Sequence, residues 1–129
     1  MVNILLVMAG GAIGSALRYL FGKLSFHLFG PNPLWGWPWG TLGVNVIGGL
    51  VMGLFVGWMA ARAQGGEYIR LFFAVGVLGG FTTFSSFSLE AMLLIERGEL
   101  VSAATYALIS VFASITALAI GLGVMRAVA

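Results

Sequence analysis

The sequence of 129 residues contains no cysteine and very little charge. The absence of cysteine excludes disulfide scaffolds, zinc sites of the cysteine type and iron–sulfur clusters. Only 8% of the residues are charged, against about 25% in an ordinary soluble domain. The net charge of +2 is too small to indicate a nucleic-acid partner. Because 60% of the residues are hydrophobic, one water-facing core cannot hide them, and a membrane protein is expected.

The few charges leave four uncharged stretches, at residues 1–17, 24–61, 71–89 and 100–125. A helix needs about 20 mainly apolar residues to cross the hydrocarbon layer. The pattern therefore predicts an all-α membrane protein, a single domain over residues 1–129 with four transmembrane helices. We place these helices at about 3–23, 40–61, 69–95 and 101–126. No Lys or Arg precedes the first apolar run, so we expect this helix to be retained and not cleaved as a signal peptide.

The connection over residues 24–39 contains all three prolines and three of the four tryptophans. These residues are Pro31, Pro33, Pro38, Trp35, Trp37 and Trp39. Proline ends helices and tryptophan prefers the headgroup zone, so the connection is predicted to be an ordered interfacial loop. His27 lies in it, and we expect a surface contact there instead of a proton relay.

The basic residues are divided almost evenly between the two predicted sides of the membrane. One side carries Arg62, Arg70 and Arg126. The other side carries Lys23 and Arg97, and Arg18 if it reaches the surface. Orientation follows the difference between the two sides, which is close to zero here. The chain is therefore predicted to insert both ways and to pair as an antiparallel homodimer, the alternative being one orientation set by other features.

Small and polar residues recur every fourth position in the first two helices. In the first they are Gly10, Gly14, Arg18 and Gly22, and in the second Thr41, Asn45, Gly49, Gly53 and Gly57. This spacing forms one stripe, and small stripes let helices approach closely in lipid. Both stripes are therefore expected to face protein. Arg18 is interpreted as a snorkelling anchor or a cavity residue, and Asn45 as an interhelical fastener or a cavity residue.

The fourth predicted helix carries a stripe of hydroxyl groups at the same spacing. Its members are Ser102, Tyr106, Ser110 and Ser114. A single serine in a membrane helix often bonds to its own backbone and carries little information. Four on one stripe favour a pathway lining, with helix packing by small polar residues as the alternative.

The third predicted helix contains an unusual segment at residues 79–88, with two adjacent glycines, five hydroxyls and three phenylalanines. Such a sequence is a poor continuous helix, so we expect two half-helices broken near the membrane midplane. A break of this kind frees carbonyls for a cation and amides for an anion. Phe84 and Phe87 lie three residues apart, and their positive ring edges suit an anion, unless they face lipid or the core. Glu90 follows as a proton coupler or as a structural, pore-mouth carboxylate.

With these features combined, the sequence resembles the small membrane fluoride channels of the Fluc family, also called CrcB. The resemblance covers essentially the whole chain, and the segment 79–88 is highly specific. The other matching motifs are Leu17-Arg18, Trp37-Pro38-Trp39-Gly40-Thr41, Val44-Asn45, Glu90, Glu96-Arg97-Gly98, and Tyr106 with Ser110 and Ser114.

The resemblance implies an antiparallel dual-topology homodimer whose two pores passively export cytoplasmic fluoride across the inner (plasma) membrane. With the segment's own hydroxyls Thr83 and Ser86, the expected fluoride path comprises Arg18, Asn45, Thr83, Phe84, Ser86, Phe87, Tyr106, Ser110 and Ser114. The resemblance also implies a structural sodium ion at the dimer centre, held by the backbone carbonyls of Gly79 and Thr82. Some relatives extend the polar track by a threonine where this chain has Leu118, so the track is expected to end at Ser114.

Two other functional classes fit parts of the sequence. A proton-coupled exporter of the small-multidrug type would also be a four-span antiparallel dimer. It needs a carboxylate in its binding site, usually in the first helix, and here only Glu90 would serve. A noncatalytic scaffold held together by its glycine stripes is the second. An enzyme is not expected, because the sequence shows no nucleophile with a base, no metal cluster and no phosphate loop.

Overall fold

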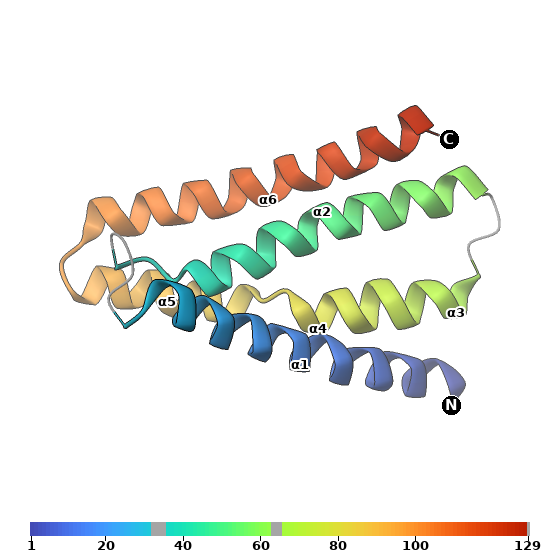
Figure 1. The fold of residues 1–129 in the computed structure, drawn as a ribbon, viewed down its shortest axis with the longest axis horizontal. Coiled ribbons are helices and arrows are strands. Elements are labelled where there is room, and N and C mark those ends of the chain that lie inside the picture. The colour runs from blue at the N-terminus through green and yellow to red at the C-terminus, as the bar shows by residue number, and fades with distance from the viewer. Residues whose placement is uncertain (32–35, 63–65, 129) are drawn as a thin grey trace.

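The structure, a computed structural model, describes residues 1–31, 36–62 and 66–128, all of whose regular elements are helices. Three spans are single long helices, α1 (Val2–Phe29), α2 (Trp39–Arg62) and α6 (Leu100–Val128). The third span is built from α3 (Glu67–Ile69), the π-helical η2 (Arg70–Leu78), α4 (Gly79–Phe81) and α5 (Phe84–Glu96). Figure 1 shows the spans lying lengthwise along one another, with both termini at the same end of the bundle.

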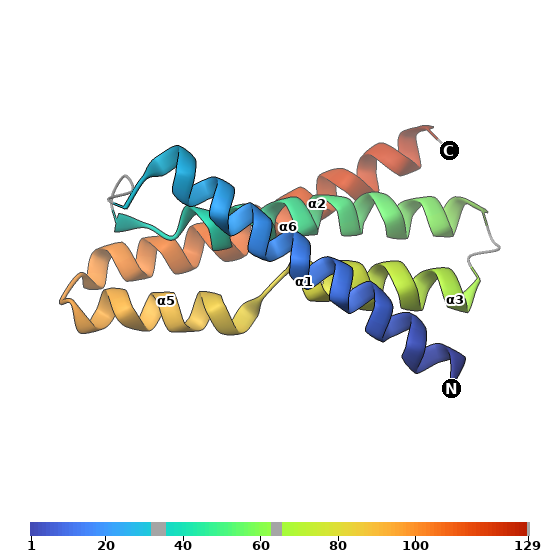
Figure 2. The ribbon, with the colours of Figure 1, turned by 60° about the horizontal axis from the view of Figure 1, so that its bottom comes forward.

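The predicted four-span fold is confirmed. Among the described residues, four helices are long and apolar enough to cross a membrane, over Val2–Phe29, Trp39–Arg62, Glu67–Glu96 and Leu100–Val128. Figure 2, turned about the long axis, shows that α1 crosses the third span obliquely close to its interruption. The π-helical turns of η2 were not predicted from the sequence, because wide turns of this kind have no distinct composition.

The first helix is longer than predicted. It continues through residues 24–29, which were assigned to the interfacial loop, and ends at Gly30. Gly30 has a φ of 73° and its amide donates to the Phe26 carbonyl at 2.7 Å, which closes the helix. The loop prediction was wrong for residues 24–29 because the helix-ending prolines begin only at Pro31. The parts of that prediction that concern residues 32–35, including Pro33 and Trp35, lie outside the described residues.

The predicted glycine stripes lie where helices touch. On α1, a side chain at Gly10 or Gly14 would collide with backbone carbonyls of η2, those of Phe72 and Val77. On α2, the neighbour is α6, whose backbone approaches Gly49 and Gly53 in the same manner. Close approach of this kind drives helix association in lipid, where no hydrophobic force acts between helices.

Two glycines of the stripes differ from the rest in their surroundings. A side chain at Gly57 would collide with the side chain of Met125 on α6, whereas a side chain at Gly22 would meet nothing within 4 Å. The stripe prediction therefore holds from Gly10 to Gly14 and along α2, and it fails at Gly22. Gly22 lies instead beside a cavity between the end of α1 and the start of α2.

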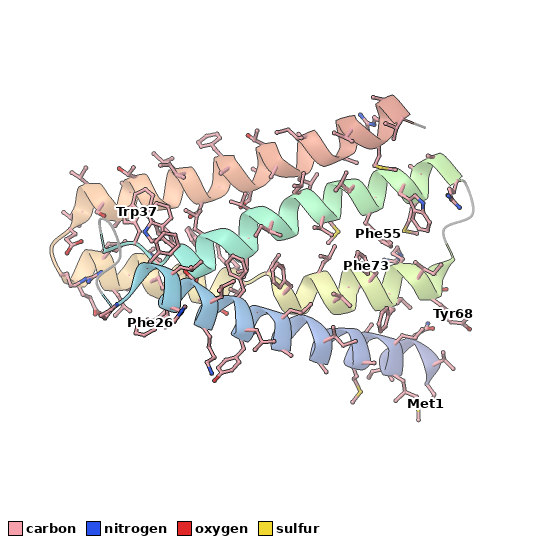
Figure 3. All side chains as sticks on the ribbon, in the orientation of Figure 1. Met1, Phe26, Trp37, Phe55, Tyr68 and Phe73 are labelled. Carbon is pink, nitrogen blue, oxygen red and sulfur yellow. The ribbon has the colours of Figure 1, made fainter. Side chains whose placement is uncertain are left out.

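Most large apolar side chains point outward. Figure 3 shows them projecting on all sides of the bundle. The small buried core lies at the end of the bundle where α2 begins, and consists of Trp37, Leu42, Leu94, Ala103 and Tyr106. An exterior this apolar suits a chain surrounded by acyl chains or by another copy of itself.

Candidate functional site

The third span is interrupted at Thr82 and Thr83. Their backbone is extended, with φ and ψ of −85° and 158° at Thr82 and −151° and 123° at Thr83. The interruption falls in the middle of the span Glu67–Glu96 and confirms the predicted pair of half-helices. It lies at the two threonines and not at the glycine pair, since Gly79 and Gly80 are still helical. β-Branched residues favour extended backbone, which accounts for this position.

Asn45 of α2 bonds to both backbone groups of Thr83, within the interruption. Its Oδ1 accepts from the Thr83 amide at 2.8 Å, and its Nδ2 donates to the Thr83 carbonyl at 2.9 Å. Thr83 is only 8% exposed, so these two backbone groups have little access to water. One side-chain amide thereby replaces the backbone partners that the break removes. The bond to Thr83 occupies one of the two Nδ2 hydrogens and leaves the second for another acceptor.

The side chain of Thr83 caps the second half-helix. Its Oγ1 accepts from the Ser86 amide at 3.1 Å and lies 3.3 Å from the Ser85 hydroxyl. Thr82 turns the other way and donates from its Oγ1 to the Leu78 carbonyl at 2.9 Å, at the end of the first half-helix. Each threonine side chain therefore bonds to a backbone group at the end of the half-helix that it adjoins. These bonds stabilise the break without any charged group.

The break leaves several carbonyls without their helical donors, among them those of Gly79 and Thr82. The Thr83 amide would bond to the Gly79 carbonyl in a continuous helix but bonds to Asn45. In the same way the Ser86 amide bonds to the Thr83 side chain and not to the Thr82 carbonyl. The Thr82 carbonyl is reached by Nη1 of Arg18 at 3.5 Å. Freed carbonyls of this kind suit a sodium ion. Among the described residues, there is no group of three or more His, Asp or Glu side chains that could hold a metal ion.

A groove of about 380 Å³ runs beside the break, between α2, α5 and α6. The predicted path residues that line it are Asn45, Thr83, Phe84, Phe87, Ser110 and Ser114. The hydroxyl oxygens of Ser110 and Ser114 are buried and have no hydrogen-bond partner within the described part of the chain. A buried donor without a partner is costly, so these two hydroxyls are ready to bind a polar ligand. Leu118 borders the same groove, in line with the expected end of the polar track.

A second cavity, of about 590 Å³, opens between the end of α1 and the start of α2. Arg18, Ser86 and Glu90 line it, together with Thr83. Thr83 therefore borders both cavities, and the broken segment stands between this Arg18 cavity and the groove. The structure thus divides eight of the nine predicted path residues into two adjoining sets that meet at Thr83. The ninth, Tyr106, is fully buried and borders neither cavity.

Glu90 is held by two hydroxyl groups. Thr41 donates to its Oε1 at 2.8 Å, and Tyr106 donates to its Oε2 at 3.1 Å. Arg18 lines the same cavity, but no ion pair joins it to Glu90 among the residues that the structure describes. The sequence placed Thr41 on a contact stripe without identifying its partner, since a distance of 49 residues along the chain leaves no local signal.

A row of aromatic rings connects the groove to the core. The rings of Phe84 and Phe87 have centroids 5.5 Å apart, and Phe87 lies 5.4 Å from Tyr106. Trp37 then meets Tyr106 edge-on at 5.8 Å. Phe84 is 77% exposed, whereas Tyr106 is fully buried.

Ser102 does not share the surroundings of the other serines on its stripe. Its hydroxyl accepts from Nε1 of Trp37 at 2.8 Å and does not line the groove. Sequence reasoning had grouped Ser102 with Ser110 and Ser114 because spacing alone cannot distinguish their neighbours. It also assigned Trp37 only to the membrane interface and missed its contact with Tyr106.

Comparison with known proteins adds an independent finding. Residues 5–122 match the family described as "CrcB-like protein, Camphor Resistance (CrcB)". Three similar proteins are each named "Fluoride-specific ion channel FluC". The one from Novosphingobium aromaticivorans is 53% identical over 123 residues, covering 95% of each chain. Those from Agrobacterium fabrum and Rhizobium leguminosarum bv. trifolii are 52% and 50% identical, covering 98% and 100% of each chain.

Proposed function

This chain belongs to the CrcB family, and from that membership we propose that it is a fluoride-selective channel that lets cytoplasmic fluoride leave the cell passively. The observation that carries the proposal is the break in the third span, where Asn45 bonds to the Thr83 backbone. This break adjoins a groove in which two buried hydroxyls have no partner among the described residues. Relatives of about half-identical sequence carry a fluoride-channel name. The chain acts in transport and not as an enzyme.

The proposed path begins at the Arg18 cavity and continues past Thr83 into the groove. Arg18 raises the local concentration of anions at the mouth, and Ser86 supplies a hydroxyl there. Fluoride is small and strongly hydrated, so the path must replace its water with donors at fixed positions. The second Asn45 N–H, the hydroxyls of Ser110 and Ser114 and the ring edges of Phe84 and Phe87 supply them.

The proposed functional unit is an antiparallel homodimer with two pores. Its support is the nearly even distribution of basic residues between the two ends and the exposure of the path residue Phe84. Phe84 in particular is 77% exposed in the single chain, so a second copy would complete the wall of the groove. Tyr106 belongs to the path through its contact with Phe87 and its bond to Glu90.

The residues that would hold the proposed sodium ion are Gly79 and Thr82, whose backbone carbonyls from both subunits would supply oxygen ligands. Both carbonyls lose their helical donors at the break, and Gly79 is exposed toward the surroundings of the single chain. When bound, the ion would supply a fixed positive charge that attracts the carbonyl oxygens of both broken spans. Measuring ²³Na binding and dimer content with and without sodium tests this assignment: a dimer that persists unchanged in sodium-free buffer contradicts it.

Export needs no coupled energy source in the proposed plasma-membrane location. Moving one negative charge outward through a potential of about 100 mV, negative inside, releases about 2.3 kcal/mol. The deciding experiment places purified protein in liposomes loaded with potassium fluoride, adds valinomycin and records efflux with a fluoride electrode. We expect fluoride release far above that of empty liposomes, and little release when chloride replaces it. Fluoride release no faster than from protein-free liposomes would contradict the proposed function.

A further inference from the structure

Trp37 connects the beginning of α2 to α6 from the residues just before the helix. Its side chain is 5% exposed, and its Nε1 donates to the Ser102 hydroxyl at 2.8 Å. Figure 3 places Trp37 at the end of the bundle where α2 and α6 both begin. A buried indole N–H needs a partner, so the Ser102 bond fixes the ring in one orientation.

The ring of Trp37 in turn determines where Tyr106 lies. Trp37 meets the Tyr106 ring edge-on at 5.8 Å, while Phe87 packs against the same ring at 5.4 Å. Tyr106 is fully buried between them, and its hydroxyl reaches Oε2 of Glu90 at 3.1 Å. Protein interiors are close-packed, so a change in the Trp37 ring opens space into which the Tyr106 ring shifts.

We propose that Trp37 is a positioning residue of the ion path: bonded to Ser102, it backs Tyr106 so that this ring supports Phe87 and its hydroxyl stays on Glu90. The inference rests on the proposed fluoride-channel function. Trp37 itself borders the Arg18 cavity and not the groove, so it acts on the pore wall through Tyr106.

Two substitutions remove the same hydrogen bond from opposite ends. Ser102→Ala deletes the acceptor and changes one oxygen atom, whereas Trp37→Phe deletes the donor and shortens the ring. We expect Ser102→Ala to lower fluoride efflux by about fivefold, the factor that corresponds to one neutral hydrogen bond, and Trp37→Phe to lower it at least as much. Ser102→Thr keeps the hydroxyl and is expected to restore efflux.

The matched control is Trp58→Phe, the same chemical change near the end of α2, whereas Trp37 lies just before its beginning. Trp58 contacts Phe55 and the Arg62 guanidinium and has no part in the row of rings. Efflux is measured per milligram of protein that elutes as a single species in size-exclusion chromatography. Trp58→Phe is expected to conduct as the wild type does, and an equal loss in this variant would overturn the proposal.

The remaining outcomes separate the positioning role from the channel function itself. Wild-type liposomes that release no fluoride contradict the proposed function. Wild-type release with unchanged efflux in Ser102→Ala contradicts only the role of Trp37, as does a Ser102→Thr variant that stays as slow as Ser102→Ala. If Trp37→Phe does not fold, Ser102→Ala and Ser102→Thr decide the matter alone.

Discussion

Replacing Asn45 by leucine should destabilise the protein and close the path, because no other side chain among the described residues bonds to both backbone groups of Thr83. Leucine has the same number of non-hydrogen side-chain atoms, branched at the same carbon, so its shape fits between α2 and the third span while both hydrogen bonds, at 2.8 and 2.9 Å, are lost. The Thr83 amide and carbonyl then lie buried without partners.

The magnitude follows from two limits. Interhelical hydrogen bonds in membranes contribute on average about 0.6 kcal/mol each, which sets a lower limit of about 1.2 kcal/mol for the pair. Leaving a buried polar group unsatisfied costs about 1–3 kcal/mol, which sets an upper limit of about 6 kcal/mol. The backbone can recover part of this loss, since the Thr83 amide regains the Gly79 carbonyl if the helix closes. We therefore expect a loss of about 2–3 kcal/mol in the free energy of unfolding.

Closure of the helix would also remove the freed carbonyls and displace Phe84. Fluoride efflux should accordingly fall by about tenfold or more, because conduction depends on donors at fixed positions. Unfolding in mixed micelles of increasing SDS fraction, followed by tryptophan fluorescence, measures the stability. The control is Thr105→Val, which removes an exposed hydroxyl bonded only to the Val101 carbonyl of its own helix, at 2.7 Å. An Asn45→Leu protein with wild-type stability and efflux would refute the conclusion that Asn45 holds the break through the Thr83 backbone.

Three further predictions concern the ring pair, the carboxylate and the glycine contacts. Phe84→Ile or Phe87→Ile should lower fluoride efflux by well over tenfold while the dimer survives in size-exclusion chromatography, and normal conduction in both would disprove ring-edge coordination. Glu90→Gln should still release fluoride under valinomycin, whereas complete loss would favour proton coupling. Gly53→Leu should prevent folding because its side chain meets the Leu118 carbonyl, whereas Gly123→Leu on α6, which meets nothing within 4 Å, should fold; the yield of monodisperse protein measures both.

Local sequence was sufficient for the features that depend on neighbouring residues. The break was predictable because glycines and β-branched threonines disfavour a continuous helix within a few residues of themselves. Its exact position within the segment 79–88 came from the structure, which breaks at Thr82 and Thr83 while α4 keeps Gly79 and Gly80 helical. The first helix ends later than predicted because a proline disfavours helix only at its own position and just before it, and the first proline is Pro31.

Contacts between distant segments were beyond the reach of periodicity. The stripe on α2 indicated that Asn45 faces protein, but only the fold shows that it meets Thr83, 38 residues away. In the same way the serine stripe on α6 separates in space: Ser102 bonds to Trp37, while Ser110 and Ser114 border the groove. A stripe specifies the direction of a side chain on its own helix and not the identity of its partner.

By itself, the sequence determined that this chain has four apolar spans, a charge-free interruption in the third, and glycines where helices meet. These properties follow from the energy of apolar groups in lipid and from the backbone preferences of single residues. Only the tertiary structure decided which polar group completes which backbone, and which rings and hydroxyls border one groove. Those choices depend on how helices cross, and helix crossing is set by close packing across the whole bundle.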